Sequence, residues 1–207
     1  MDVDRLVARP ASRADAPGEP LTFACAMSAE ERAARRLGRT ALVGLAVANG
    51  VPDGERLVSF GIAGALRAGL PVGTVIDAVR VVDEGGSVLW EGEPLGVVAA
   101  RRGTILGAGR IVDDPAERAA LHACTGADAV DMESATLARS GRLVGCIRAI
   151  SDTPELKLAG LAEAAKLDGR VDVRGLVRGF LRAPVETTRA ALAAARALRR
   201  LQRVILA

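Results

Sequence analysis

Three short apolar runs most constrain how this chain can fold. They are LTFACAM from residue 21, LVSFGIAGAL from residue 57 and LVGCIRAI from residue 143. Apolar runs of this length that lack alternating polar residues are typical of strands buried on both faces of a sheet. Helical patterns lie between them, and we expect helices within residues 28–38, 40–54 and 114–127 and, after a short strand, within residues 129–141. This alternation predicts an α/β domain with the strands at its centre.

The remaining segments complete the predicted organisation. Residues 1–19 are rich in Pro, Ala, Arg and Asp without a period, so we expect an irregular lead-in before a single domain at residues 20–207. Residues 73–90 alternate β-branched and polar side chains around a DEGG turn, which predicts antiparallel strands. In the first helix, Ser28 is the expected N-cap and Gly38 the expected stop.

The C-terminal segment from Pro184 has apolar residues at helical spacing with arginines around them. This pattern predicts an amphipathic helix packed on the sheet. The same pattern is also compatible with a peripheral contact on an anionic membrane, so both interpretations stay open.

Composition excludes several classes of function. The net charge is only +3, and basic residues are not interleaved with aromatic ones, which argues against a nucleic-acid surface. One histidine and three cysteines without a C-x-x-C pair predict no metal site and reduced thiols. The N-terminal residues lack the apolar core of a signal peptide and no apolar run reaches 18 residues, so we expect a cytoplasmic protein.

Three acids follow predicted strands and are the first candidates for chemistry. Glu30 follows the first apolar run, Glu133 follows a short strand near residue 130, and Asp152 follows the third run. Ligands of α/β sheets collect outside the carboxyl ends of the strands, where these acids lie. An acid at such a place is also a common helix N-cap or first-turn residue, and that alternative applies to each of them.

The motifs SFGIAGAL, VDMES and ISD, in this order, resemble those of the nucleoside phosphorylase and nucleosidase superfamily. The likeness runs from about Leu21 to Gly179 and implies a three-layer α/β/α domain with a central mixed twisted sheet. It also implies a homo-oligomer without metal or organic cofactor. Only EERAARRLGRT lies between Glu30 and Thr40, where the family has two further strands, so we expect a shortened N-terminal half.

Within that superfamily, three stretches are most similar to the hopanoid-associated phosphorylases. They are SFGIAGAL, AALHACTGADAVDMES and DGRVDVRGLVRGFLRAP. Members of that group are taken to remove adenine from an adenosyl-hopane lipid, so the likeness implies a lipid-linked nucleoside as substrate.

The resemblance implies cleavage of the C1′–N9 bond of an adenine nucleoside. This reaction develops positive charge on ribose and negative charge on the base. Asp152 would protonate or hydrogen-bond N7 and meet the exocyclic amine, while Glu133 accepts from the ribose hydroxyls and Met132 packs on the sugar. Arg148, a charge in an apolar strand, would lie beside the nucleophile or form a structural ion pair. For Asp131, a capping or structural role is as good an interpretation as any other.

Further site residues follow from the same resemblance. Glu30 would activate water, since AMSAEE resembles the start of adenine nucleosidases. The other expected substrate contacts are Ile62, Ala63 and Gly64 below the nucleophile, Ser151 beside the purine, and Ile111 and Val112 as aliphatic packing for the base. A phosphate co-substrate would lie on Gly38, Arg39 and Thr40.

The sequence leaves three functions open. The first is phosphorolysis or hydrolysis of an adenine nucleoside, with the hopane lipid as one candidate 5′ group. A methylthioadenosine or adenosylhomocysteine nucleosidase is the second. The third is a degenerate, non-catalytic member that binds a nucleoside or lipid, which the shortened N-terminal half and the hydroxyl-free Ile62 favour.

Overall fold

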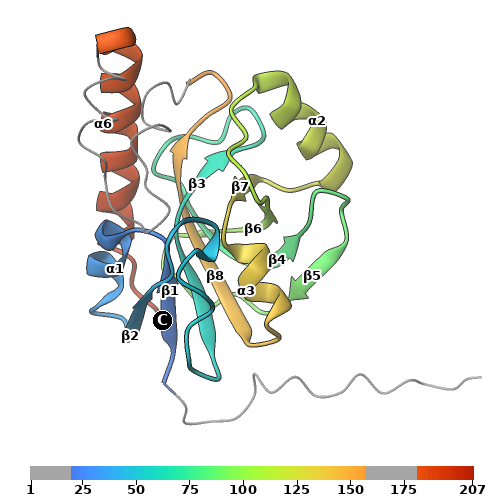
Figure 1. The fold of residues 1–207 in the computed structure, drawn as a ribbon, viewed down its shortest axis with the longest axis vertical. Helices are drawn as coiled ribbons and strands as arrows, with labels where there is room; N and C mark the ends of the chain where they lie inside the picture. Colours follow the sequence, from blue (N-terminus) through green and yellow to red (C-terminus); the bar gives the residue numbers. More distant parts are fainter. Residues whose placement is uncertain (1–19, 157–180) are drawn as a thin grey trace, which may run out of the picture.

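A computed structural model describes residues 20–156 and 181–207 of the chain (Figure 1). The expected lead-in at residues 1–19 lies outside the described residues, as does most of the DGRVDVRGLVRGFLRAP stretch. The order of elements in the described part confirms the predicted α/β alternation.

Eight strands form one mixed sheet. Its path runs β2-β1-β3-β7-β6-β4-β5, and β8 pairs with both β3 and β4. The strands are β1 (Thr22–Cys25), β2 (Arg39–Leu42), β3 (Leu57–Ala65), β4 (Val75–Val82), β5 (Val88–Glu91), β6 (Arg101–Gly107), β7 (Ala129–Asp131) and β8 (Leu143–Asp152).

The pairings of five strands close into a circuit. β3 is parallel to β8 and antiparallel to β7, β8 is antiparallel to β4, and β6 is parallel to both β4 and β7. The sheet therefore curls back on itself, and β1 and β2 extend it from β3 as a parallel pair. The antiparallel pair predicted around DEGG is confirmed as β4 and β5.

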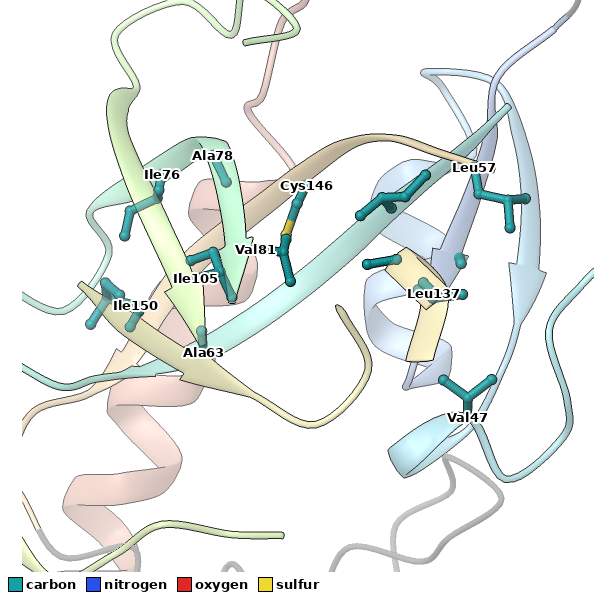
Figure 2. Close-up of a cluster of buried hydrophobic side chains, with 14 of the residues drawn as sticks. Val47, Leu57, Ala63, Ile76, Ala78, Val81, Ile105, Leu137, Cys146 and Ile150 are labelled. Atoms are coloured by element: carbon teal, nitrogen blue, oxygen red, sulfur yellow. The ribbon is translucent and has the colours of Figure 1, made fainter. Parts of the chain in front are cut away.

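Helices cover the sheet on both sides (Figure 1). They are α1 (Ser28–Ala34), α2 (Pro115–Thr125), α3 (Ser134–Arg139) and α6 (Pro184–Leu201). One core cluster joins the sheet to Leu137 of α3, and Figure 2 shows its side chains. Another joins the sheet to Ala33 of α1 and to Ala197 and Leu201 of α6. The predicted mixed sheet with flanking helices is confirmed. The prediction that the C-terminal segment forms a helix packed on the sheet is also confirmed.

The prediction of a helix at residues 40–50 is wrong. The segment instead forms β2, which pairs with β1, and a 3₁₀ turn at Leu45–Val47. Gly44, Ala46 and Val47 have φ of 72°, 51° and 60°, a conformation that no α-helix tolerates. Here the pairing of TAL with an apolar neighbour strand overrides the helical propensity of an Ala- and Leu-rich segment.

The boundaries of α1 also differ from the prediction. Met27, not Ser28, is the N-cap, and the helix ends at Ala34, before Gly38. The side chain of Glu30 accepts a hydrogen bond from the Met27 N–H at 2.9 Å, so the third helical residue closes the first turn.

No helix in residues 20–156 and 181–207 is both long and apolar enough to cross a bilayer.

Gly107 at the end of β6 allows α3 to approach the sheet closely. A Cβ at this position would lie within 3.0 Å of the backbone N and the Cβ of Ala135 in α3. Gly109, two residues further, has open space around it and no positive φ. These two glycines therefore form a matched pair for testing the helix–sheet contact.

We expect Gly107→Ala to lower the free energy of unfolding by about 1–3 kcal/mol, because overpacking forces α3 away from β6. Gly109→Ala should change it by less than about 0.5 kcal/mol, as surface substitutions do. Urea unfolding of both variants measures the difference. Equal stability of the two variants would contradict the close approach of α3 to β6.

Candidate functional site

The three candidate acids lie at or after the ends of three strands that each pair with β3. Glu30 is in α1 after β1, Glu133 follows β7, and Asp152 ends β8. All three are buried, with exposed fractions of 1%, 6% and 3%. The register of β3 and β8 places Gly61 beside Arg148 and Gly64 beside Asp152. The C-terminal half of β3 therefore borders both Arg148 and Asp152.

Arg148 forms a buried ion pair with Asp131. Its side chain is 2% exposed, and its Nε donates to Asp131 Oδ2 at 2.5 Å while its Nη2 contacts the same oxygen. Nη2 also donates to Ser59 Oγ at 2.6 Å, whereas Glu133 Oε2 lies 3.9 Å away. Burial lowers the pKa of Arg148, but Asp131 and the other nearby acids raise it further, so the net change is upward. Arg148 is thus in an ion pair with Asp131, while its place beside the nucleophile stays a prediction.

Asp131 also fixes the start of α3. Its Oδ1 accepts hydrogen bonds from the Ser134 N–H at 3.0 Å and from Ser134 Oγ at 2.6 Å. The capping role considered for Asp131 is therefore confirmed, and the same carboxylate binds Arg148 through its other oxygen.

Glu133 is an acid whose neighbours favour its protonated form. Its Oε1 accepts a hydrogen bond from the Ala46 N–H at 3.0 Å, in the 3₁₀ turn. Burial and then the negative charge of Asp131 raise the pKa of Glu133 to about 8, against a smaller opposing effect of Arg148. At neutral pH this carboxyl therefore carries a proton and can both donate and accept.

Glu30 connects α1 to β3. Its Oε1 accepts from the Ile62 N–H at 2.8 Å, and burial raises its pKa above the ordinary value. A Cβ on Gly61 would lie 2.5 Å from the same oxygen, so only glycine leaves room for this carboxyl. Ile62 thus contributes its backbone N–H rather than its side chain.

Asp152 forms the second buried ion pair of this edge, with Arg118 of α2. Arg118 Nη2 donates to Asp152 Oδ2 at 2.5 Å. Ser151 Oγ lies 2.6 Å from Asp152 Oδ1 and 3.1 Å from the Ala63 carbonyl oxygen. Both oxygens of Asp152 therefore have donors, and its neighbour Ser151 contacts it directly.

Sequence reasoning missed Arg118 and Ser59. Ser59 carries a hydroxyl inside the apolar run of β3, and Arg148 carries a charge inside the apolar run of β8. The two polar residues in apolar runs could have predicted a buried polar pair. Arg118 lies in the helical pattern DPAERAALHACTGA, where no sequence signal marks it as buried.

The expected phosphate residues do not join this group. Arg39 and Thr40 pair with Thr22 and Phe23, at the amino end of β1, whereas Glu30 follows its carboxyl end. Thr40 Oγ1 donates to Glu31 Oε1 at 3.3 Å, and Gly38 lies near the ring of Phe23. The structure therefore places Gly38, Arg39 and Thr40 at the opposite edge of the sheet.

The remaining expected contacts lie near the acids or beside them. Met132 is half-buried between Asp131 and Glu133. Val112 is buried and its carbonyl accepts from Arg118 Nε, whereas Ile111 is 41% exposed. Among the residues that the structure describes, no group of three His, Cys, Asp or Glu side chains is arranged to hold a metal ion.

Comparison with solved structures identifies the fold. A methylthioadenosine/adenosylhomocysteine nucleosidase from Colwellia psychrerythraea, solved with adenine, matches with a TM-score of 0.53 at 16% identity, covering 90% of this chain and 97% of that one. The nucleosidase of the same kind from S. pneumoniae, solved with a transition-state inhibitor, gives 0.52 at 17% identity, with 86% and 99% covered. This chain has the nucleosidase fold.

A third solved structure agrees. The futalosine hydrolase of Helicobacter pylori matches with a TM-score of 0.52 at 15% identity, covering 87% of this chain and 96% of that one. No family model and no curated protein matches the sequence. The nucleosidase fold confirms the predicted fold class.

We expect Glu133→Gln to remove a pH-dependent loss of stability. In the folded protein the pKa of Glu133 is raised to about 8, whereas in the unfolded chain this carboxyl has its ordinary pKa of 4.5. The unfolded state therefore binds fewer protons between these values, and stability falls as pH rises, by up to about 1.4 kcal/mol per pH unit.

Urea unfolding of the parent and of Glu133→Gln at intervals from pH 5 to pH 9 measures this difference. The variant should gain stability relative to the parent up to about pH 8, and the difference should then stay constant. Glu93→Gln, at an exposed glutamate, is the control. Parallel curves for parent and Glu133→Gln would show that Glu133 ionises alike in both states.

Proposed function

We propose that this protein cleaves the bond between adenine and ribose in an adenine nucleoside. The observation that carries the proposal is the set of three buried acids, Glu30, Glu133 and Asp152, that border β3 in a nucleosidase fold. Buried acids with raised pKa values concentrate at catalytic sites. The Colwellia psychrerythraea structure of the same fold was solved with adenine, which supports adenine as the base.

In the proposed reaction, the C1′–N9 bond breaks with its electron pair moving to the base, and an oxygen of the acceptor bonds to C1′. Asp152 contacts the purine, Glu133 the ribose hydroxyls, and Met132 the sugar face. With water as acceptor, Glu30 takes the proton that the water loses, and Asp152 gives a proton to N7 of the departing base. Burial raises the pKa of Glu30, and a carboxylate with a raised pKa is a stronger general base.

The geometry favours water over phosphate. Gly38, Arg39 and Thr40 lie at the far edge of the sheet, and Ile62 offers no side-chain hydroxyl. The two buried arginines of the site, Arg148 and Arg118, are already paired with Asp131 and Asp152. A phosphate would therefore meet acids before it met an unpaired cation.

The 5′ group of the substrate is the finer part of the proposal. The likeness of AALHACTGADAVDMES to the hopanoid-associated phosphorylases supports a lipid-linked adenosine. The solved nucleosidases of the same fold support methylthioadenosine or adenosylhomocysteine as the alternative. A homo-oligomer is proposed on the same resemblance, and a non-catalytic nucleoside-binding protein remains the competing function.

Adenine release from methylthioadenosine, adenosylhomocysteine and an adenosine with a long apolar 5′ group tests the proposal, each with and without phosphate. We expect release without phosphate. Glu30→Gln should reduce it by about 10²- to 10⁴-fold, because the general base is lost. Glu31→Gln is the matched control, since Glu31 pairs with Arg35 on the surface of the same helix.

This assay tests the choice of water as acceptor and the proposed cleavage itself separately. Release only in the presence of phosphate would make the protein a phosphorylase and overturn the preference for water. No release from any substrate by folded protein would favour the non-catalytic function. The preferred 5′ group decides between lipid and thio-nucleoside substrates.

The outer face of α6 supports a peripheral contact with an anionic lipid surface. Val185 and Leu192 lie seven residues apart on this face and are 57% and 62% exposed. The exposed Arg189 and Arg196 have the same seven-residue spacing, and Arg199 lies seven residues beyond Leu192. An exposed apolar row flanked by arginines is complementary to anionic lipid, whereas two such faces from a second copy would repel each other.

We expect the protein to sediment with vesicles of phosphatidylglycerol and phosphatidylcholine and not with phosphatidylcholine alone. Arg196→Gln should weaken binding about fivefold, since one arginine near an anionic surface contributes about 1 kcal/mol. Arg101→Gln, at an exposed arginine of β6, is the control. Equal sedimentation with both vesicle types, or with neither, would exclude this contact.

A further inference from the structure

The turn after β2 contains two residues in a conformation that L side chains rarely adopt. Ala46 and Val47 have φ of 51° and 60°, in the left-handed region of the backbone. For a β-branched side chain such as that of valine, this region is a true outlier. Backbone strain of this kind persists only where neighbouring contacts hold the chain in place, and it gathers at functional sites.

The core holds this turn through Val47. The side chain is 7% exposed and belongs to the same cluster as Leu57 of β3 and Leu137 of α3 (Figure 2). The Val47 N–H donates to the Gly44 carbonyl at 3.2 Å and closes the turn from within. Because an ordinary backbone conformation would draw Val47 out of the core, the burial of this side chain compensates the strain.

The strained turn directs one backbone group at the candidate site. The Ala46 N–H donates to Glu133 Oε1 at 3.0 Å, across 87 residues of sequence. The other oxygen, Oε2, lies 3.9 Å from Arg148 Nη2, beyond hydrogen-bond distance. Glu133 therefore has one oxygen in a hydrogen bond with the turn, and its other oxygen faces Arg148.

The contacts of α3 fix the backbone of Glu133 but not its carboxyl. The Leu137 N–H donates to the Glu133 carbonyl at 3.0 Å, and Asp131 caps the next residue, Ser134. The side-chain torsions of a glutamate stay free under such contacts and can occupy several rotamers. The hydrogen bond from the Ala46 N–H acts on the carboxyl directly and selects among these rotamers.

We propose that Ala46 is a positioning residue, whose backbone N–H holds Oε1 of Glu133 and leaves Oε2 to meet the ribose. The inference rests on the proposed function, because it takes Glu133 as the residue that contacts the ribose hydroxyls. A carboxyl that is oriented before binding loses less freedom when the sugar arrives, so it binds the sugar more tightly than a mobile carboxyl does.

The same substitution at two neighbouring positions tests the strain. Ala46→Gly should raise the urea midpoint, because glycine adopts a positive φ without strain. Ala48→Gly should lower it, because Ala48 is exposed and has an ordinary helical φ of −60°. A lower midpoint for both variants would show that Ala46 is not left-handed. The inference would then fall, because the direction of the Ala46 N–H depends on that conformation.

Amide hydrogen exchange, followed by NMR, tests the contact in the folded protein. In Glu133→Ala the Ala46 N–H should exchange at least about tenfold faster than in the parent, because its acceptor is lost. The Val47 N–H, whose acceptor is Gly44, is the internal reference and should change much less. Equal exchange of the Ala46 N–H in both proteins would overturn the inference.

The effect on ribose binding is measured with a nucleoside that cannot be cleaved. In 9-deazaadenosine a carbon–carbon bond replaces C1′–N9, and 9-deazaadenine is the corresponding free base. The ratio of their dissociation constants, from calorimetric titration, reports the contribution of the ribose. Replacement of Ala46 by lactic acid turns the amide into an ester and removes the N–H. This change should reduce the ratio about five- to tenfold, as expected for one hydrogen bond.

A double variant and a control separate positioning from a merely structural role. In the Glu133→Ala background, lactic acid at position 46 should leave the ratio unchanged, since the two groups act as one unit. Ala48→Gly should keep the ratio of the parent. A merely structural N–H would instead weaken the binding of nucleoside and base alike, and that result would overturn the inference. If the ester variant does not fold, the exchange of the Ala46 N–H in Glu133→Ala still decides.

The outcomes distinguish this inference from the proposed function. A parent that favours the nucleoside over the base, together with an unchanged ratio in the folded ester variant, would overturn the role of Ala46 and leave the proposed function standing. Loss of protection of the Ala46 N–H on saturation with 9-deazaadenosine would do the same, because the turn would then release Glu133. A parent that binds neither ligand would remove both the inference and the proposed function.

Discussion

The burial of Arg148 is the constraint on which this edge of the structure depends. An unpaired guanidinium inside a protein costs several kcal/mol, so a strand that carries one through the core must bring partners to it. Asp131 and Ser59 supply them, from β7 and β3. Because Asp131 also caps α3 through Ser134, the ion pair fixes where that helix begins. Glu133 lies between Asp131 and Ser134 in the sequence, so the same contacts also fix its position.

The pairing of Arg148 with Asp131 also determines the state of Glu133. The guanidinium of Arg148 lies among several acids, and Asp131 is the one that forms the ion pair with it. Glu133 remains 3.9 Å away, buried and beside a negative neighbour, which is why its pKa rises to about 8. The two acids of this motif, two residues apart, thus have different parts: Asp131 binds Arg148 and Ser134, whereas the pKa of Glu133 is raised. Environments that separate two carboxyls in this way are how enzymes divide acid and base roles.

The sequence predicted those features that depend on local pattern. The apolar runs became β1, β3 and β8 because no other element can bury so much aliphatic surface. Glu30, Glu133 and Asp152 each come at or after the end of a strand that pairs with β3, although β7 runs antiparallel to β3 and the other two run parallel to it. The helix expected at residues 40–50 failed because pairing with β1 decides the structure of this segment. Arg118 was missed because its partner is 34 residues away in the chain.

The two arginines of the site differ in how many acids surround them, and this difference fits the proposed chemistry. Arg118 forms an ion pair with one acid, Asp152. Arg148 carries one positive charge against Asp131, Glu133 and Glu30, and the last two respond with raised pKa values. A sugar that becomes cationic as its glycosidic bond breaks would supply the positive charge this cluster lacks. That positive charge would favour the ionised forms of Glu133 and Glu30. Their attraction to the sugar would then grow with the charge on C1′, so these acids would stabilise the transition state more than the bound substrate, which lowers the barrier.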